Sequence, residues 1–289
     1  MQKTDTFALV GGDRRQAFLA GLLAEEGYTV IAAGLEETEL PCRVTGCTNP
    51  GQAVALADWV VLPLPVTRDG TALNAPFSRT PILLSDLAES LTAGQRVFGG
   101  NIPPAFTAAL QSRGVRAEDY FAREELAILN AVPTAEGAVQ LAMEELPVTL
   151  QGSRCLITGF GRVGSALARL LRAMGARVTV AARSAAARAG AAALGCGETD
   201  MAGIGEERYD VIFNTVPARI FTADLLKRLD RNTLIIDLAS RPGGVDMEAA
   251  AALSLKTVWA LSLPGRVAPK SAAAAIRRTL LTMLGEVAP

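Results

Sequence analysis

The sequence predicts an α/β protein with two parallel sheets, because strand-like and helix-like segments alternate along the chain. Short runs of β-branched residues are each followed by an Ala/Leu-rich stretch of helical period, a rhythm typical of parallel strands joined by crossover helices. The rhythm starts again after about residue 150, and 289 residues suit two domains of about 150 residues each. We therefore expect two Rossmann-like domains with an interdomain cleft.

The first predicted domain covers residues 1–122. A helix over 14–26 follows its first strand and ends at Gly27, and Pro103-Pro104 opens another helix. Five segments have the composition of strands: 7–10, 28–33, 59–62, 95–98 and 115–120.

Residues 123–150 are predicted to form an interdomain helix, with a break or cap near Pro133. The second domain covers 151–268 and contains a helix over 163–174. Its predicted strands are 154–158, 177–181, 211–213, 234–237 and 257–260. A last amphipathic helix begins at Pro269, and we expect the segment 269–289 to pack back on the first domain. A ligand is expected in the cleft, beyond the carboxyl ends of the strands.

The composition excludes several kinds of site. Lys and Arg number 28 against 29 Asp and Glu, so the net charge of −1 and the lack of a basic stripe argue against nucleic acid as a partner. The chain has no histidine, which excludes a Ser-His-Asp triad, a histidine base and every histidine-containing metal site. The cysteines Cys42, Cys47, Cys155 and Cys196 lack metal-site spacing, so we expect reduced thiols and no metal.

The sequence also favours a cytoplasmic location. Its first residues lack the pattern of a signal peptide. No uninterrupted apolar run reaches about 18 residues, so we expect no membrane-spanning segment.

Residues 159–164 read GFGRVG and lie between a predicted strand and a predicted helix. In this G-x-G-x-x-G fingerprint, the first glycine makes a tight turn, the second lets the backbone approach a pyrophosphate, and the third lets helix and strand pack closely. The amides at the helix N-terminus then bind the phosphates. A glycine turn without a ligand is the alternative, but the next strand also follows at the required spacing. The expected contacts are Gly159, Phe160, Gly161, Arg162, Val163 and Gly164.

The end of the following strand favours NADP(H) over NAD(H). NAD-binding domains usually place an acidic residue there, which accepts a hydrogen bond from the ribose 2′-hydroxyl. Here Arg183 can pair with a 2′-phosphate, Ser184 can donate another hydrogen bond, and Arg188 lies one turn further along. The alternative is that Arg183 is a solvated surface charge. Small and polar residues suit the chain beneath a nicotinamide ribose, and they follow the strand 211–213: Asn214, Thr215, Val216 and Pro217.

Five short segments stand out along the chain: VGGDRRQ at 10–16, NAVPTAEG at 130–137, ARS at 182–184 after the glycine fingerprint, DLASRPGG at 237–244 and LPGRVAPKS at 263–271. Together they resemble the A subunits of dipicolinate synthase. The last two segments are the most specific, because dinucleotide-binding folds in general do not carry them.

The resemblance implies an NADP-dependent oxidoreductase that works with a flavoprotein-like B subunit. The pair converts dihydrodipicolinate, or its hydrated precursor, to dipicolinate in the mother cell of a sporulating bacterium. This oxidation removes a hydride and a proton from a cyclic imine dicarboxylate and leaves an aromatic ring. The protein therefore mainly has to bind two carboxylates and orient one C–H bond.

Cations are expected to bind the substrate carboxylates. We expect Arg241 and Lys270 in this role, with Arg14 or Arg15 as a third cation. For each of them the alternative is a solvated surface charge. The hydroxyls expected in the same site belong to Thr134, Ser240 and Ser271.

The sequence leaves the proton acceptor open among three residues. Glu136 is the first candidate, because it lies in the polar step TAEG at 134–137 of the interdomain stretch. Asp237 ends a predicted strand, and it could instead fix Arg241 or a neighbouring amide. Lys270 would serve only in its neutral form, which burial favours.

Three other functions share features with this sequence. A 2-hydroxyacid dehydrogenase has the same layout but uses a histidine, which this chain lacks. A shikimate-dehydrogenase-like NADP oxidoreductase uses a lysine of its first domain, whereas this chain has no lysine between Lys3 and Lys227. A non-catalytic NADP-binding subunit that regulates or scaffolds the complex would carry the same motifs. We expect a homodimer, since dimers are the commonest assemblies.

Overall fold

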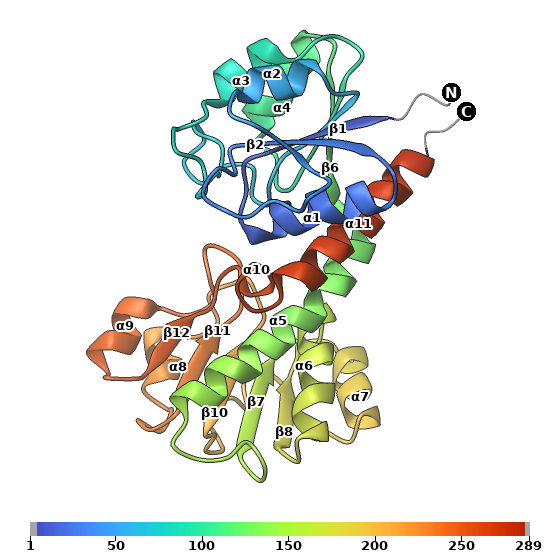
Figure 1. The fold of residues 1–289 in the computed structure, drawn as a ribbon. Helices are drawn as coiled ribbons and strands as arrows, with labels where there is room; N and C mark the ends of the chain where they lie inside the picture. The colour runs from blue at the N-terminus through green and yellow to red at the C-terminus, as the bar shows by residue number, and fades with distance from the viewer. Residues whose placement is uncertain (1–4, 287–289) are drawn as a thin grey trace. The chain divides into compact units, whose positions relative to one another are not determined.

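The computed structural model describes residues 5–286, which form two compact units. Within the described residues, the first unit contains 5–129 and 268–286, and the second contains the residues between them. Each unit has its own six-stranded sheet, and all the strand pairs within the two sheets are parallel (Figure 1). The prediction of an α/β protein with two parallel sheets is confirmed.

The two sheets share one strand order. The first sheet runs β3-β2-β1-β4-β5-β6, and the second runs β9-β8-β7-β10-β11-β12 when read from its other edge. Counted from its own first strand, each sheet has the order 3-2-1-4-5-6 of a Rossmann fold. The order reverses between β1 and β4 in one unit and between β7 and β10 in the other, and ligands of such sheets bind beyond the carboxyl ends of the strands at this point.

Helices cover both faces of the first sheet. The strands are β1 (Thr6–Val10), β2 (Thr29–Ala33), β3 (Thr45–Cys47), β4 (Trp59–Val61), β5 (Arg96–Gly99) and β6 (Arg116–Asp119). The helices are α1 (Arg14–Glu25), α2 (Pro50–Ala55), α3 (Leu84–Ser90), α4 (Pro104–Ser112), the short 3-10 helix at Tyr120–Ala122 and α11 (Pro269–Gly285). Helix α11 shares a buried core with α1, where Ile276 and Leu280 pack with Leu19 and Leu23. The last helix thus belongs to the first unit although 138 residues of the second unit precede it.

The second unit repeats this arrangement. Its strands are β7 (Arg154–Thr158), β8 (Arg177–Ala181), β9 (Gly197–Thr199), β10 (Val211–Asn214), β11 (Leu234–Asp237) and β12 (Thr257–Trp259). Its helices are the greater part of α5 (Glu124–Glu145), α6 (Arg162–Ala173), α7 (Ala185–Ala193), α8 (Ala223–Leu226), α9 (Met247–Ala252) and α10 (Leu263–Val267). Residues of α5 and α6 fill one core cluster, and residues of α8 and α9 fill another.

Helix α5 corrects one prediction. It continues through Pro133 without a break, although a proline inside a helix removes one hydrogen bond. The buried alanines of this helix, Ala135, Ala138 and Ala142, pack into the core of the second unit, and this packing outweighs the lost bond. Among the described residues, α5 is also the one helix long and apolar enough to cross a membrane, and half of its most apolar stretch is buried.

Candidate functional site

The loop from Gly159 to Gly164 joins β7 to α6 at the carboxyl edge of the second sheet. Gly159 has a φ of +89°, and a Cβ there would lie 2.6 Å from the Thr215 hydroxyl oxygen. At Gly164 a Cβ would lie only 2.3 Å from the Gly159 carbonyl oxygen. Both positions therefore require glycine for close backbone packing, as the fingerprint predicts.

Gly161 differs from the other two glycines. It is the N-cap of α6, its φ of −82° is open to any residue, and no atom lies within 4 Å of the place a Cβ would take. Because glycine has no side chain, it makes no side-chain cap to the helix, and the space that a capping side chain would fill is open. The residues present fit a dinucleotide, since a pyrophosphate can approach the backbone here and bind to the helix N-terminus.

The turn after β8 holds the residues expected at the adenosine end. Arg183 is exposed, and Ser184 caps α7 by accepting a hydrogen bond from the Ala187 amide at 3.1 Å. Arg188 donates from Nη1 to the carbonyl oxygens of Ala182 (2.9 Å) and Arg183 (3.1 Å). Its Nε also lies 3.4 Å from a carboxylate oxygen of Glu198. Arg188 therefore holds the turn that presents Arg183.

The aromatic ring of Phe160 packs under the same region. It joins the core cluster as a partly buried side chain, and a Cβ at Gly190 of α7 would lie 2.9 Å from its ring. Arg162 is exposed and Val163 is partly buried, both in the first turn of α6.

The residues expected under the nicotinamide form the loop after β10. Thr215 and Val216 are partly buried and Pro217 is exposed, whereas Asn214 is fully buried. The Thr215 hydroxyl donates to the Thr158 carbonyl oxygen at 2.8 Å, which ties this loop to the strand that carries the glycine loop. The Asn214 side chain forms hydrogen bonds with Thr158, Val216 and Asp237 inside the protein and so stabilises the loop.

The loop after β11 carries the predicted carboxylate binder Arg241. The Arg241 guanidinium is exposed and its carbon lies 5.8 Å from the centre of the Trp259 ring. Ser240 is exposed beside it, and its carbonyl oxygen accepts from the Gly243 amide at 2.9 Å. Asp237, which precedes this loop, is 1 % exposed and accepts hydrogen bonds from neighbouring groups. Of the two roles that the sequence left open for Asp237, these contacts support the fixing of neighbouring amides.

The other predicted site residues are divided between the units. Thr134 and Glu136 lie on the part of α5 in the second unit, where Glu136 is exposed and the Thr134 hydroxyl donates to the Asn130 carbonyl oxygen at 2.7 Å. Lys270 and Ser271 are exposed in the first turn of α11, which belongs to the first unit. That these groups meet at one substrate stays a prediction.

Arg14 and Arg15 follow the glycine turn of the first unit but differ in their surroundings. Arg14 is exposed and lines a hollow of about 480 Å³ together with Glu37 and Glu39. Arg15 is 8 % exposed, donates from Nε and Nη2 to the Asp13 carboxylate and from Nη2 to the Leu64 carbonyl oxygen at 2.6 Å. Arg15 thus serves as an internal tie, so Arg14 is the better candidate for a third substrate cation.

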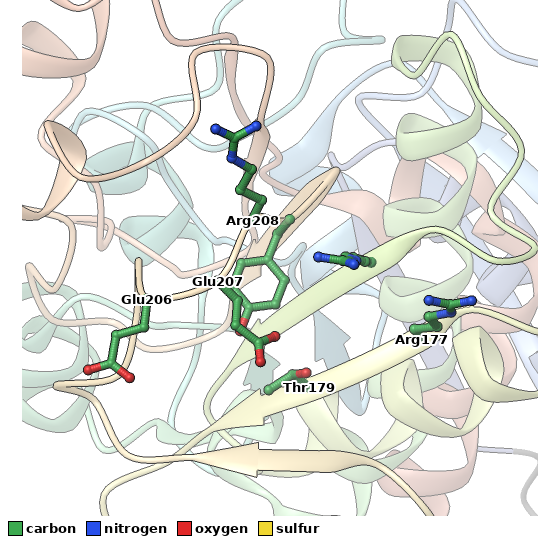
Figure 2. A pocket seen from close by; sticks show the side chains of 7 residues that line it. Arg177, Thr179, Glu206, Glu207 and Arg208 are labelled. Atoms are coloured by element: carbon green, nitrogen blue, oxygen red, sulfur yellow. The ribbon is translucent and has the colours of Figure 1, made fainter.

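A second hollow of about 460 Å³ lies at the opposite edge of the second sheet, where β7 and β8 begin (Figure 2). It is lined by Arg154, Arg177, Thr179, Glu206, Glu207, Arg208 and Tyr209. Figure 2 shows acidic and basic side chains around the same opening, so the charges of this hollow are mixed. It lies away from the glycine loop, and among residues 5–286 no group of three cysteine or acidic side chains comes together to hold a metal.

Sequence reasoning missed two residues near the site. Thr158, at the end of β7, is fully buried and donates to the Asn214 side chain at 2.6 Å. Trp259 donates from its indole nitrogen to the Ala239 carbonyl oxygen at 3.0 Å and lies beneath Arg241. A signal for the first was present in the sequence, since the predicted strands 154–158 and 234–237 end in Thr158 and Asp237, and Asn214 directly follows the predicted strand 211–213.

Comparisons with known proteins agree with both units. The N-terminal domain of the dipicolinate synthase A subunit matches residues 6–121, and the NAD-binding domain of D-isomer specific 2-hydroxyacid dehydrogenases matches residues 126–259. The second match supports a nicotinamide dinucleotide as cofactor and an oxidoreductase as the class of protein.

Whole-chain relatives are also found. The chain is 31 % identical to the dipicolinate synthase A subunit of Bacillus subtilis strain 168, over 97 % of this chain and 96 % of the relative. The crystal structure of the dipicolinate synthase A subunit from Bacillus halodurans covers 100 % of both chains with a TM-score of 0.90 and 28 % identity. The A chain of dipicolinate synthase from Bacillus subtilis gives a TM-score of 0.87 at 30 % identity, over 99 % of this chain and 97 % of that one. The chain therefore belongs to the family of dipicolinate synthase A subunits.

Proposed function

We propose that this chain is the subunit of a dipicolinate synthase that binds NADP(H) and oxidises dihydrodipicolinate, or its hydrated precursor, to dipicolinate. The family supports the substrate class, because its named members are dipicolinate synthase A subunits. The observation that carries the proposal is the glycine loop between β7 and α6, where Gly159 and Gly164 pack closely and the space at the Cβ position of Gly161 is open.

The preference for NADP(H) rests on the turn after β8. Arg183 and Ser184 stand where a domain selective for NAD(H) usually has a carboxylate. The exposed guanidinium of Arg183 can form charge-assisted hydrogen bonds to a 2′-phosphate, and the Ser184 hydroxyl keeps its proton for donation while its oxygen caps α7. Arg188 contributes by holding the turn, since its Nη1 already donates to two carbonyl oxygens.

The residues of the chain supply binding and proton transfer. A bound nicotinamide would accept the hydride from the ring carbon, while the ring loses a proton to a base and becomes aromatic. Arg241 and Lys270, with Arg14 as the third cation, bind the two carboxylates and so orient the reacting C–H bond. Glu136 is the base that we favour, because it is exposed, whereas Asp237 is almost fully buried.

The wider setting is part of the same proposal. A flavoprotein-like B subunit is the expected partner, and we expect the chain itself to form a homodimer. A cytoplasmic location in the mother cell of a sporulating bacterium follows from the family.

The first experiment is a titration of the purified chain with NADPH and with NADH, followed by nucleotide fluorescence. Arg183→Ala should weaken NADPH about tenfold, because one charge-assisted contact of about 1.4 kcal/mol is lost, and should change NADH less than about twofold. Arg177→Ala is the matched control, since Arg177 is exposed at the opposite end of the same strand. Equal weakening of both nucleotides by Arg183→Ala would contradict the preference for NADP(H).

Turnover then separates an enzyme from a regulatory protein. Dihydrodipicolinate and NADP are supplied to this chain, to the B subunit, and to the two together. Reduction of NADP that requires this chain, and that falls at least about tenfold in Glu136→Gln, supports the proposed oxidation. Unchanged reduction when only the B subunit is present would assign this chain a regulatory or scaffolding role.

A further inference from the structure

Three buried polar side chains form a hydrogen-bonded row at the carboxyl ends of the strands of the second sheet. Thr158, Asn214 and Asp237 end the neighbouring strands β7, β10 and β11, and the strand register pairs Asn214 with both of the others. The Thr158 hydroxyl donates to Asn214 Oδ1 at 2.6 Å, and Asn214 Nδ2 donates to Asp237 Oδ1 at 2.7 Å. All three residues are at most 1 % exposed.

Asp237 is the last side chain of this row and accepts hydrogen bonds from three donors. Besides Asn214, the Ala239 amide donates to Oδ1 at 3.1 Å and the Gly244 amide donates to Oδ2 at 2.8 Å. These two amides are the two ends of the loop that carries Arg241. Both carboxylate oxygens thus accept hydrogen bonds, two at Oδ1 and one at Oδ2, as a buried acidic group requires.

The loop is held on its other sides as well. Trp259 Nε1 donates to the Ala239 carbonyl oxygen at 3.0 Å, and a Cβ at Gly244 would lie 2.1 Å from Asn214 Nδ2. Asn214 also bonds to Val216, in the loop expected under the nicotinamide. Its Nδ2 donates to the Val216 carbonyl oxygen at 3.1 Å, and its Oδ1 accepts from the Val216 amide at 3.2 Å. One buried pair therefore fixes two loops, one on the cofactor side and one on the Arg241 side.

We propose that Asp237 and Asn214 are positioning residues that set Arg241 relative to the dinucleotide and thereby determine how tightly the dicarboxylate binds. The inference rests on the proposed function for the role of Arg241, but not for the position of the loop. A buried donor–acceptor network has this consequence because each member has one arrangement that satisfies all of its partners. Neither residue needs to touch the substrate.

The test is Asp237→Asn, which keeps the shape and changes one acceptor into a donor. Whichever way the new amide turns, its NH₂ group meets either the Gly244 N–H or the donors of Asn214 and Ala239. We expect the Kd for pyridine-2,6-dicarboxylate, measured with NADPH bound, to rise about tenfold, while the Kd for NADPH changes less than about twofold. Asp210→Asn is the control, because Asp210 accepts from the Arg154 amide at the opposite edge of the sheet.

A second readout needs no substrate. In a Trp59→Phe background the remaining tryptophan is Trp259, which reports on the loop through its contacts with Ala239 and Arg241. Asp237→Asn should increase the quenching of Trp259 fluorescence by acrylamide, and Asp210→Asn should not.

The outcomes separate this inference from the proposed function. Unchanged Trp259 quenching in Asp237→Asn would overturn the positioning role, whether or not the protein binds a dicarboxylate. Equal weakening of NADPH and dicarboxylate would also overturn it, because that is the result of a general loss of structure. If wild-type protein or Arg241→Ala shows that the dicarboxylate does not bind through Arg241, the proposed function loses its substrate cation, and changed Trp259 quenching would still support the positioning of the loop.

Discussion

The two units carry a glycine turn at the same place in two sheets of the same strand order, yet the turns have different surroundings. In the first unit the Asp13 carboxylate accepts from the Arg15 amide and so caps α1. In the second unit the N-cap of α6 is Gly161, which has open space around it. The N-cap of α1 thus carries a carboxylate that accepts from an amide of its own helix, whereas the N-cap of α6 has no side chain and leaves space for a ligand.

The comparison teaches that glycines alone do not mark a dinucleotide site. Gly12 has a φ of +95°, and a Cβ there would lie 2.8 Å from the Gln16 Cβ, so this glycine serves a tight packed turn. A carboxylate at the N-cap also places negative charge where a phosphate would have to lie. The residue that caps the helix decides between the two cases, and it can be read from the sequence.

The largest expected effect is on the closed turn. Arg15→Ala should lower the free energy of unfolding of the first unit by about 2–3 kcal/mol, because it removes the guanidinium that donates to the Asp13 carboxylate and to the Leu64 carbonyl oxygen. Denaturant unfolding followed by the fluorescence of Trp59, in a Trp259→Phe background, measures this unit.

Arg14→Ala is the control for that measurement. Arg14 is exposed, so its loss should cost less than about 0.5 kcal/mol. If Arg15→Ala lowers the free energy of unfolding no more than Arg14→Ala does, Arg15 does not stabilise the turn of the first unit. Neither variant should change the Kd for NADPH, since both residues belong to the other unit.

The next effect is on the open turn. Gly161→Ala should leave the unfolding free energy within about 0.5 kcal/mol, because the φ of −82° suits alanine and no atom lies within 4 Å of the new methyl group. It should raise the Kd for NADPH about tenfold, since that methyl group occupies the space a pyrophosphate needs.

Gly12→Ala should give the reverse result. Its positive φ and the close Gln16 side chain predict a loss of about 1 kcal/mol or more in the stability of the first unit, with an unchanged Kd for NADPH. A Gly161→Ala variant that binds NADPH as tightly as the wild type would show that the two turns do not differ in the way proposed.

Local patterns explain why much of the fold could be predicted. Interior strands such as β1 and β7 contain apolar runs, FALV at 7–10 and CLI at 155–157, and the glycine loop carries its own motif. The edge strands β3 and β9 could not be predicted, because each has three residues, TGC and GET, whose strand conformation comes from pairing with a neighbour. Tertiary packing likewise keeps α5 helical through Pro133.

The candidate site divides in the same way. Arg183 and the glycine loop follow from residues close together in sequence, whereas Thr158, Asn214 and Asp237 are separated by 56 and 23 positions. They meet only because β7, β10 and β11 pair in one register, which depends on the whole second sheet. The role of Asp237 at the base of the Arg241 loop therefore required the structure.

The smallest expected effect concerns the thiols, which divide between the units as the turns do. Cys42 is exposed and Cys47 is partly exposed in the first unit, whereas Cys155 and Cys196 are buried in the second. Burial raises the pKa of Cys155 to about 11 and also raises that of Cys196, so at pH 8 only about 0.1 % of Cys155 is thiolate.

Because the thiolate is the reactive form, an aromatic disulfide reagent at pH 8 should label two thiols quickly and the other two only in denaturant. Mass spectrometry assigns the labelled residues. Rapid labelling of Cys155 in the native protein would mean that the core of the second unit opens readily. It would contradict the view that the glycine turn of this unit, although open, is firmly supported.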